Sequence, residues 1–467
     1  MSHSQVLYGI SFDGVAVSGI TAEFIKLAAL FHRRGYAVHL DLGYDIKPDK
    51  GNFFREYGRE TRSIPPWIQL GRAVDFTRIP GYGPGLADRL REECAGHRLS
   101  SFELDIASAI RRISAQIVAT WRRLGVTMVV VENGTLPENV VYTRALYAAI
   151  AEYGRERGSG PFVLWRDHDV MWFCEPGKYG PPPYRHVPRP RSSPYIRYAA
   201  LTEPAAQSLS RWSGASYAVL PNAFEFREHR EPRRMREAFG IPADAFLIAR
   251  CSRVIPQKRI DREVRLLHTA GALASSRGWS RALHLFITGS LDENPAEAAA
   301  LKALAESLGV ERQVHFGNAL LPCDAPAEHG CFSVSDLLVE SDLSSFLTSY
   351  RYEGFGNAPA EACAHRVPYV STRYELYDAV YGRLGLRALM LPLDARDEEP
   401  SEAWTAALTD RIMDAPRLKA DAAFNFERAR RHLSTSAFSE RLAGLFPDLF
   451  AGAAARNVHA EERGVRP

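Results

Sequence analysis

Residues 352–370, Y-E-G-F-G-N-A-P-A-E-A-C-A-H-R-V-P-Y-V, are the most informative part of this chain. Seven residues separate Glu353 from Glu361, and they begin with a Gly-Phe-Gly turn. The pattern predicts a loop that carries the first acid, a helix that starts near Pro359, and the second acid in the first turn of that helix. Glycines let a backbone approach a ligand closely, and a helix N-terminus offers free N–H groups to an anion. The stretch suits a sugar nucleotide, with one acid for sugar hydroxyls and one for ribose hydroxyls; the alternative is a surface helix with two acids placed by chance.

A basic motif lies upstream, in residues 251–258, C-S-R-V-I-P-Q-K, directly after the apolar run 245–249. A nucleoside diphosphate gains negative charge as it leaves, and the planar fork of Arg253 and the point charge of Lys258 would stabilise that charge. Two solvated cations on an ordinary loop are the alternative. The order and separation of this motif and the first one favour the functional interpretation.

Together the two motifs resemble the R-x4-K and E-x7-E signatures of retaining glycosyltransferases with the GT-B fold. This group contains sucrose, trehalose and phosphatidylinositol-mannose synthases. Residues 335–377 are also similar to a subgroup that includes mannosylglucosylglycerate-type synthases. The resemblance implies an α/β fold with two Rossmann-like domains that face each other across a cleft, and a C-terminal helix that crosses back to the N-terminal domain.

The resemblance also implies the reaction, a metal-independent transfer of a hexose-type sugar from a nucleoside diphosphate to an acceptor with retention of configuration. No side chain acts as the nucleophile, and the protein contributes positioning and charge stabilisation. The implied catalytic residues are Glu353, His168, Arg253 and Lys258, and the implied donor-binding residues are Gly19, Arg253, Lys258, Gly354, Phe355, Gly356, Asn357 and Glu361.

Short apolar runs alternate with helical periodicities in the N-terminal half, which predicts a doubly wound parallel sheet. Residues 45–100 show no clear period. In the C-terminal half, a further set of apolar runs predicts a second sheet. Predicted strands are residues 6–10, 36–42, 126–131, 162–165, 198–201, 217–220, 246–249, 283–288, 313–316, 336–340 and 367–371, and predicted helices include residues 21–34, 105–124 and 295–308.

Pro221-Asn222-Ala223 resembles the P-N-G hinge of the family, with alanine where glycine is usual. The hinge predicts an acceptor-binding domain in residues 1–222 and a nucleotide-sugar-binding domain in residues 223–435. Residues 436–450 are expected to form the crossover helix, and residues 451–467 a flexible tail.

Two loops of the N-terminal domain carry further candidates, because open α/β sheets bind ligands at the carboxyl ends of their strands. Gly19 matches a family glycine placed against the donor phosphates, although Ser18 replaces the usual second glycine. His168 matches a family histidine near the reacting sugar, and Asp169 is expected to orient it or to contact the acceptor. A glycine that merely starts a helix and a structural histidine are the alternatives.

The acceptor is expected to meet two more groups of residues. Glu132 and Asn133 follow a buried strand and are predicted to line the acceptor pocket. Arg185, together with Arg189 and Arg191, lies in a Pro-rich segment whose limited freedom suits a clamp on a negative or strongly polar group. The alternative for the three arginines is a solvated basic loop.

Composition fits a soluble globular protein with more than one domain, because the chain has 467 residues, 46% of them hydrophobic and 24% charged. The net charge of +3 gives no electrostatic case for nucleic acid as a partner. The six cysteines form no C-x-x-C pair and suit reduced thiols. No signal peptide or membrane-spanning apolar run is visible, so we expect a cytoplasmic protein without an integral membrane segment.

Other motifs for catalysis are missing from the sequence, which lacks G-x-G-x-x-G after the first strand, G-x-S-x-G and H-E-x-x-H. Asp167-His168-Asp169 could hold a divalent cation, but the two main motifs compensate charge without a metal. We expect no metal and no cofactor, a UDP- or GDP-type sugar as co-substrate, and a polar small molecule or glycan as acceptor. A phosphorylase or epimerase of the same fold and a non-catalytic nucleotide-sugar-binding protein remain alternatives.

Overall fold

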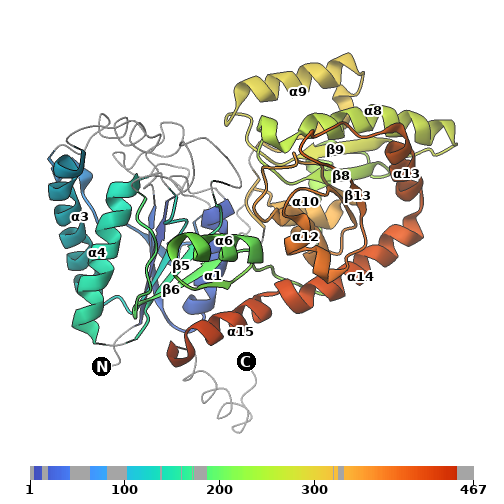
Figure 1. Ribbon diagram of the computed structural model, residues 1–467. Helices are drawn as coiled ribbons and strands as arrows, with labels where there is room; N and C mark the ends of the chain where they lie inside the picture. The colour runs from blue at the N-terminus through green and yellow to red at the C-terminus, as the bar shows by residue number, and fades with distance from the viewer. Residues whose placement is uncertain are drawn as a thin grey trace, which may run out of the picture.

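The computed structural model describes residues 5–12, 19–42, 64–80, 102–136, 139–158, 160–170, 172, 187–318, 320–323 and 331–449. These residues form two α/β domains that lie side by side (Figure 1). Each domain is built on a parallel sheet with helices on both faces, which confirms the predicted fold class.

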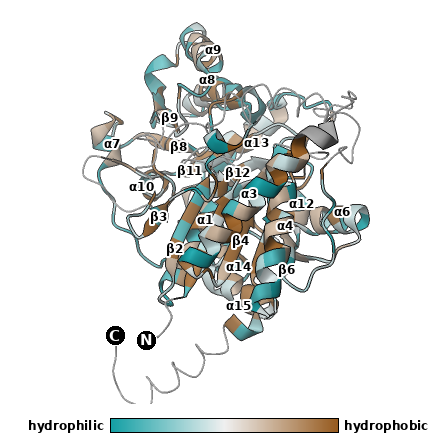
Figure 2. Ribbon diagram, turned by 90° about the vertical axis from the view of Figure 1, so that its left-hand side faces the viewer, coloured by the Kyte–Doolittle hydropathy of each residue, from teal (hydrophilic) through white to brown (hydrophobic). Residues whose placement is uncertain are grey.

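The first domain contains, in its described part, a seven-stranded parallel sheet of order β3-β2-β1-β4-β5-β6-β7. Helices α3 and α4 lie side by side over one face of this sheet, whose strands are largely hydrophobic (Figure 2). Helix α1 covers the other face. The elements are β1 (Val6–Ser11), α1 (Gly19–His32), β2 (Ala37–Leu42), β3 (Ile68–Leu70), η2 (Phe76–Arg78), α3 (Phe102–Leu124), β4 (Met128–Glu132), α4 (Val140–Arg157), β5 (Val163–Asp167), β6 (Ile196–Ala200), α6 (Glu203–Ser213) and β7 (Tyr217–Val219).

The second domain contains, among the described residues, a six-stranded parallel sheet of order β10-β9-β8-β11-β12-β13. Helices α8, α9 and α13 pack on one face, and α10, α11, α12 and α14 on the other. The elements are α7 (Met235–Ala238), β8 (Phe246–Arg250), η4 (Pro256–Lys258), α8 (Ile260–Ser276), β9 (Leu283–Ile287), α9 (Pro295–Ser307), η5 (Glu311–Gln313), β10 (Val314–Phe316), α10 (Val334–Glu340), β11 (Leu343–Phe346), α11 (Asn357–Ala364), β12 (Tyr369–Thr372), α12 (Tyr377–Val380), η6 (Gly382–Leu384), β13 (Leu389–Leu391), α13 (Glu402–Met413), α14 (Ala415–Leu433) and α15 (Thr435–Leu445).

One predicted strand, residues 336–340, is wrong, because these residues belong to helix α10. Ser333 caps this helix and forms a reciprocal capping box with Asp336, which favours a helix over a strand for the short apolar run that follows. The central strand is instead β11, Leu-Ser-Ser-Phe, whose two serines hide it from an apolar pattern.

The chain returns to the first domain at its end (Figure 1). Helix α14 packs on the second domain. Phe438 and Leu442 of α15, and Phe446 just after it, pack with Leu7 and Phe24 of the first domain. The last helix thus crosses between the domains, as the fold class predicts. Among the described residues, no helix is both long enough and apolar enough to cross a bilayer.

Candidate active site

Lys258 and Glu353 meet at the carboxyl edge of the second sheet. The Lys258 Nζ lies 2.5 Å from Glu353 Oε1, and the two side chains are only 12% and 8% exposed. The Thr348 hydroxyl donates to the same carboxylate oxygen at 2.9 Å. The structure therefore places the cation predicted for the diphosphate directly beside the acid predicted for the sugar.

Arg253, the other predicted diphosphate ligand, lies at the rim of this site. Its guanidinium pairs with the carboxylate of Glu293, and its side chain is 45% exposed. Because Glu293 already occupies the fork, Arg253 would have to exchange this carboxylate for a phosphate in order to bind the predicted donor.

Two fully buried arginines that the sequence motifs do not reveal hold the loops of the site. Arg250, at the end of β8, donates to the backbone carbonyls of Lys258 and Ser345. Arg262 donates to the carbonyl of Thr348 at 3.0 Å. These bonds fix the backbone on both sides of the Lys258–Glu353 pair.

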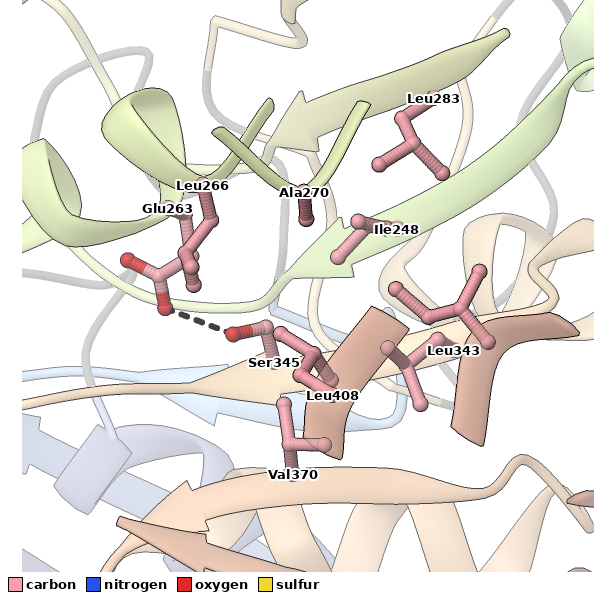
Figure 3. A pocket seen from close by; sticks show the side chains of 10 residues that line it. Ile248, Glu263, Leu266, Ala270, Leu283, Leu343, Ser345, Val370 and Leu408 are labelled. Carbon is pink, nitrogen blue, oxygen red and sulfur yellow. Dashed lines mark hydrogen bonds between the residues drawn. The ribbon is translucent and has the colours of Figure 1, made fainter. Parts of the chain in front are cut away.

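Glu263 completes this support from helix α8. Figure 3 shows its carboxylate turned toward Ser345, whose hydroxyl donates to it at 2.9 Å, within an otherwise apolar cavity. The Leu347 N–H donates to the same oxygen at 3.0 Å. Burial raises the pKa of Glu263, and the charge of Arg250 opposes this rise.

Gly289, just after β9, allows the basic loop to approach the sheet closely. A Cβ at this position would lie 2.5 Å from the Ser252 carbonyl oxygen and 2.9 Å from the Arg253 Cα. Backbone atoms cannot yield as a flexible side chain can, so only glycine fits here.

The predicted donor loop ends in a helix that starts at Asn357, two residues before the predicted start at Pro359. Pro359 fits inside the first turn because an N–H there needs no helical partner. Gly356 has a φ of +74°, and a Cβ on it would meet the Tyr374 hydroxyl at 2.5 Å. That hydroxyl donates to the Phe355 carbonyl, and the Tyr381 hydroxyl donates to the Gly356 carbonyl at 2.6 Å.

The loop therefore turns its carbonyls toward tyrosines. Within the part of the chain that the structure describes, none of the backbone N–H groups of Gly354, Phe355 and Gly356 donates to a protein acceptor. This arrangement fits the predicted use of these N–H groups for an anion. The Phe355 side chain is buried beside Phe224, so a ligand could meet only its backbone.

Glu361 lies in the second turn of α11 instead of the first, and it faces the first domain. Burial alone would lower the pKa of Lys26, but the carboxylates of Glu23 and Glu361 outweigh it and hold this pKa above its ordinary value. The Lys26 ammonium donates to Glu23 at 2.6 Å and lies over the Phe224 ring. Each predicted acid of the E-x7-E motif thus has a lysine nearby.

Asn357 connects the donor loop to the first domain. Its side-chain amide donates to Glu23 at 3.0 Å, and its amide oxygen accepts from the Asn222 side chain at 2.8 Å. Asn222, in the predicted hinge, also accepts a hydrogen bond of 2.5 Å from the buried Arg166 guanidinium. One continuous set of polar contacts thus joins the hinge, the donor loop and α1.

His168 is held in a fixed orientation at the end of β5. Its Nε2 lies 2.6 Å from a carboxylate oxygen of Glu132, and its side chain is 6% exposed. Burial alone would raise the pKa of Glu132, but the charges of His168 and Arg166 outweigh it and keep that pKa low. The ionised Glu132 carboxylate therefore holds the His168 ring in place.

Glu132 and Asn133, which are predicted to line an acceptor pocket, both have fully buried side chains. Glu132 orients His168, and the Asn133 amide oxygen accepts from the backbone N–H groups of His168 and Asp169 at 2.6 and 3.1 Å. A polar residue that follows a buried strand can hydrogen-bond either to the backbone of the next turn or to a ligand. The sequence does not distinguish these two uses. Asp169 stays half-buried and is held by Asn133 at 3.1 Å.

The remaining predicted residues are Gly19 and the three arginines of the Pro-rich segment. Gly19 is the exposed first residue of α1, and a Cβ there would meet nothing within 4 Å, so its position does not require glycine for packing. Arg185 lies outside the described residues. Arg189 and Arg191 are exposed.

Comparison with known proteins gives matches in structure only. No protein-family model matches the chain, and no curated protein matches it in sequence. The solved structure of WaaG, a glycosyltransferase involved in lipopolysaccharide biosynthesis, is 14% identical with a TM-score of 0.56, over 94% of this chain and 99% of that one. The sucrose-phosphate synthase of Thermosynechococcus elongatus is 14% identical with a TM-score of 0.56, over 96% and 100%.

A third structure contains ligands. HepE of Anabaena, in complex with UDP and glucose, is 14% identical with a TM-score of 0.58, over 96% of this chain and 100% of that one. At these identities the likeness concerns the fold, which is the two-domain GT-B fold.

Proposed function

We propose that this protein is a retaining glycosyltransferase that moves a hexose-type sugar from a nucleoside diphosphate to an acceptor without a metal ion. The observation that carries the proposal is the buried Lys258–Glu353 pair beside the backbone N–H groups of the Gly354–Gly356 turn. A cation, N–H donors and a carboxylate converge there at the carboxyl edge of a sheet, where α/β folds bind ligands. The UDP and glucose bound by HepE, which shares the fold, support the same class of donor.

In this proposal the protein stabilises the leaving diphosphate and positions the sugar. Lys258 and, after release from Glu293, Arg253 neutralise the diphosphate as its charge develops. Glu353 binds the sugar hydroxyls once Lys258 turns to phosphate, and Glu361 binds the ribose. The leaving phosphate takes the acceptor proton on the same face of the sugar, so the protein supplies no nucleophile.

The first domain would hold the acceptor near His168. The half-buried carboxylate of Asp169 is the contact that we propose for an acceptor hydroxyl, and Arg185 would bind a negative or strongly polar group on it. Glu132 would act through His168, whose ring it holds in place near the transferred sugar.

A panel of UDP- and GDP-linked hexoses tests this function. The expected result is nucleoside diphosphate release that needs an acceptor, survives a chelator, and gives a product whose anomeric configuration, read by NMR, matches the donor. A Glu293→Gln variant serves as a matched control, because it removes the charge of the carboxylate that pairs with Arg253 without removing any proposed ligand. Release without acceptor, or with inverted product, would contradict the proposal.

A further inference from the structure

A group of basic side chains lies where η6, α14 and α15 meet. Arg383, His432 and Arg441 line a pocket there, together with Pro221 of the predicted hinge and Phe355 of the donor loop. The Arg428 guanidinium donates to the Leu384 carbonyl at 3.1 Å, which joins α14 to η6. We call Arg383, Arg428, Arg431, His432 and Arg441 the junction cluster.

The arginines of the junction cluster have no ion-pair partners within the described part of the chain. Other arginines of this half of the chain are ion-paired, for example Arg411 with Asp421 and Arg430 with Glu228. Among the described residues, no carboxylate lies within ion-pair distance of Arg383, Arg428, Arg431 or Arg441, which are exposed or half-buried.

The positive charges of the junction cluster lower the pKa of two of its members, Arg441 and His432. Burial lowers the pKa of Arg441, and the charge of Arg383 lowers it further, against a partial offset from Glu440. Burial likewise lowers the pKa of His432, and the four arginines of the cluster add to this. The negative charge of an anion in the pocket would oppose the lowering of both pKa values.

We propose that the junction cluster binds the phosphate group of a small phosphorylated molecule. Arg383 from η6 and Arg441 from α15 approach from different elements and offer planar donor forks, which suit the several oxygens of a tetrahedral anion better than a two-oxygen carboxylate. Because the pocket also contacts the hinge and the donor loop, the bound phosphate would link the domains through Pro221 and Phe355. By linking the domains, the phosphate would also affect turnover. That effect rests on the proposed function, whereas phosphate binding itself does not.

Titration calorimetry with inorganic phosphate and with glycerol 3-phosphate tests the site in the full chain. We expect Arg383→Gln/Arg441→Gln to weaken binding by at least about tenfold for each arginine. The control Arg312→Gln/Arg417→Gln removes two exposed arginines elsewhere and should change nothing. Lys258→Gln should also leave this phosphate site intact. The exposed single variant Arg383→Gln serves if the double variant does not fold.

The outcomes separate the possibilities. Loss of phosphate binding in Lys258→Gln but not in Arg383→Gln would overturn the proposal and assign the phosphate to the donor site. Binding of phosphatidic acid vesicles without binding of either soluble phosphate would overturn the small-molecule assignment. In the absence of phosphate, the single variant Arg383→Gln should unfold at the same temperature as the wild type or a higher one, because it removes like-charge repulsion from an exposed position.

Discussion

Gly356 is the position where a single methyl group tests the donor loop. Its φ of +74° disfavours any residue with a Cβ, and the neighbouring Tyr374 hydroxyl would lie 2.5 Å from that Cβ. The hydroxyl cannot simply move away, because it donates to the Phe355 carbonyl and Tyr374 is buried. Gly356→Ala must therefore move the loop whose N–H groups are assigned to the donor.

The cost has two parts. A left-handed φ costs an alanine about 1 kcal/mol, and forcing a methyl group into a packed site adds about 1–3 kcal/mol. Gly214 is a matched control, since its φ is +77° and nothing lies within 4 Å of a Cβ placed there. We expect Gly214→Ala to lose only the first amount and Gly356→Ala to lose both.

Urea unfolding measures the free energies, and calorimetry with UDP and GDP measures the effect on the loop. Gly356→Ala should lower the nucleotide affinity at least about tenfold, equal to about 1.4 kcal/mol, while Gly214→Ala leaves it unchanged. Equal losses of stability in the two variants, with unchanged affinity in both, would refute the assignment of this loop to the donor.

Four further variants test other parts of the account. Glu361→Ala should mainly raise the Kd for nucleotide and Glu353→Ala should mainly lower kcat; equal effects of both on binding alone would contradict their separate roles. Asn222→Ala should lower kcat/KM several-fold with little change in nucleotide Kd, because it cuts the contact between Arg166 and the donor loop; an unchanged kcat/KM would count against this coupling. Burial raises the pKa of Asp167 from 3.8 to about 6, so its contribution to stability is present below about pH 4 and is lost as the pH rises through 6. The free energy of unfolding in urea should therefore fall by about 3 kcal/mol over that range in the wild type, and Asp167→Asn should remove this fall. Parallel pH profiles of the two proteins would refute it.

The sequence predicts most strands because apolar runs mark buried parallel strands. It fails at β11, where Ser344 and Ser345 are polar although both are buried, and the Ser345 hydroxyl donates to Glu263. It fails at α10 for the opposite reason. The apolar run there is too short to show a clear period, and the capping box of Ser333 and Asp336 makes it a helix instead of a strand.

The site is predicted only where its residues are close in sequence or follow a known spacing. Lys258 and Glu353 belong to such motifs, and the structure brings them together. Glu23 reaches Asn357 across 334 positions, a contact that depends on how the domains pack, and no local pattern encodes it. The burial of Glu132 is similarly decided by His168 and Arg166 around it.

Nucleotide binding by the basic motif is the most direct test of the central claim. Calorimetry with UDP and GDP on the wild type and on Arg253→Ala and Lys258→Ala, each checked for folding by circular dichroism, gives the answer. The account predicts that one nucleotide binds the wild type and that each variant loses at least about tenfold in affinity, since a hydrogen bond to a charged group is removed. Undiminished binding in both variants, or no binding of either nucleotide to the wild type, would contradict it.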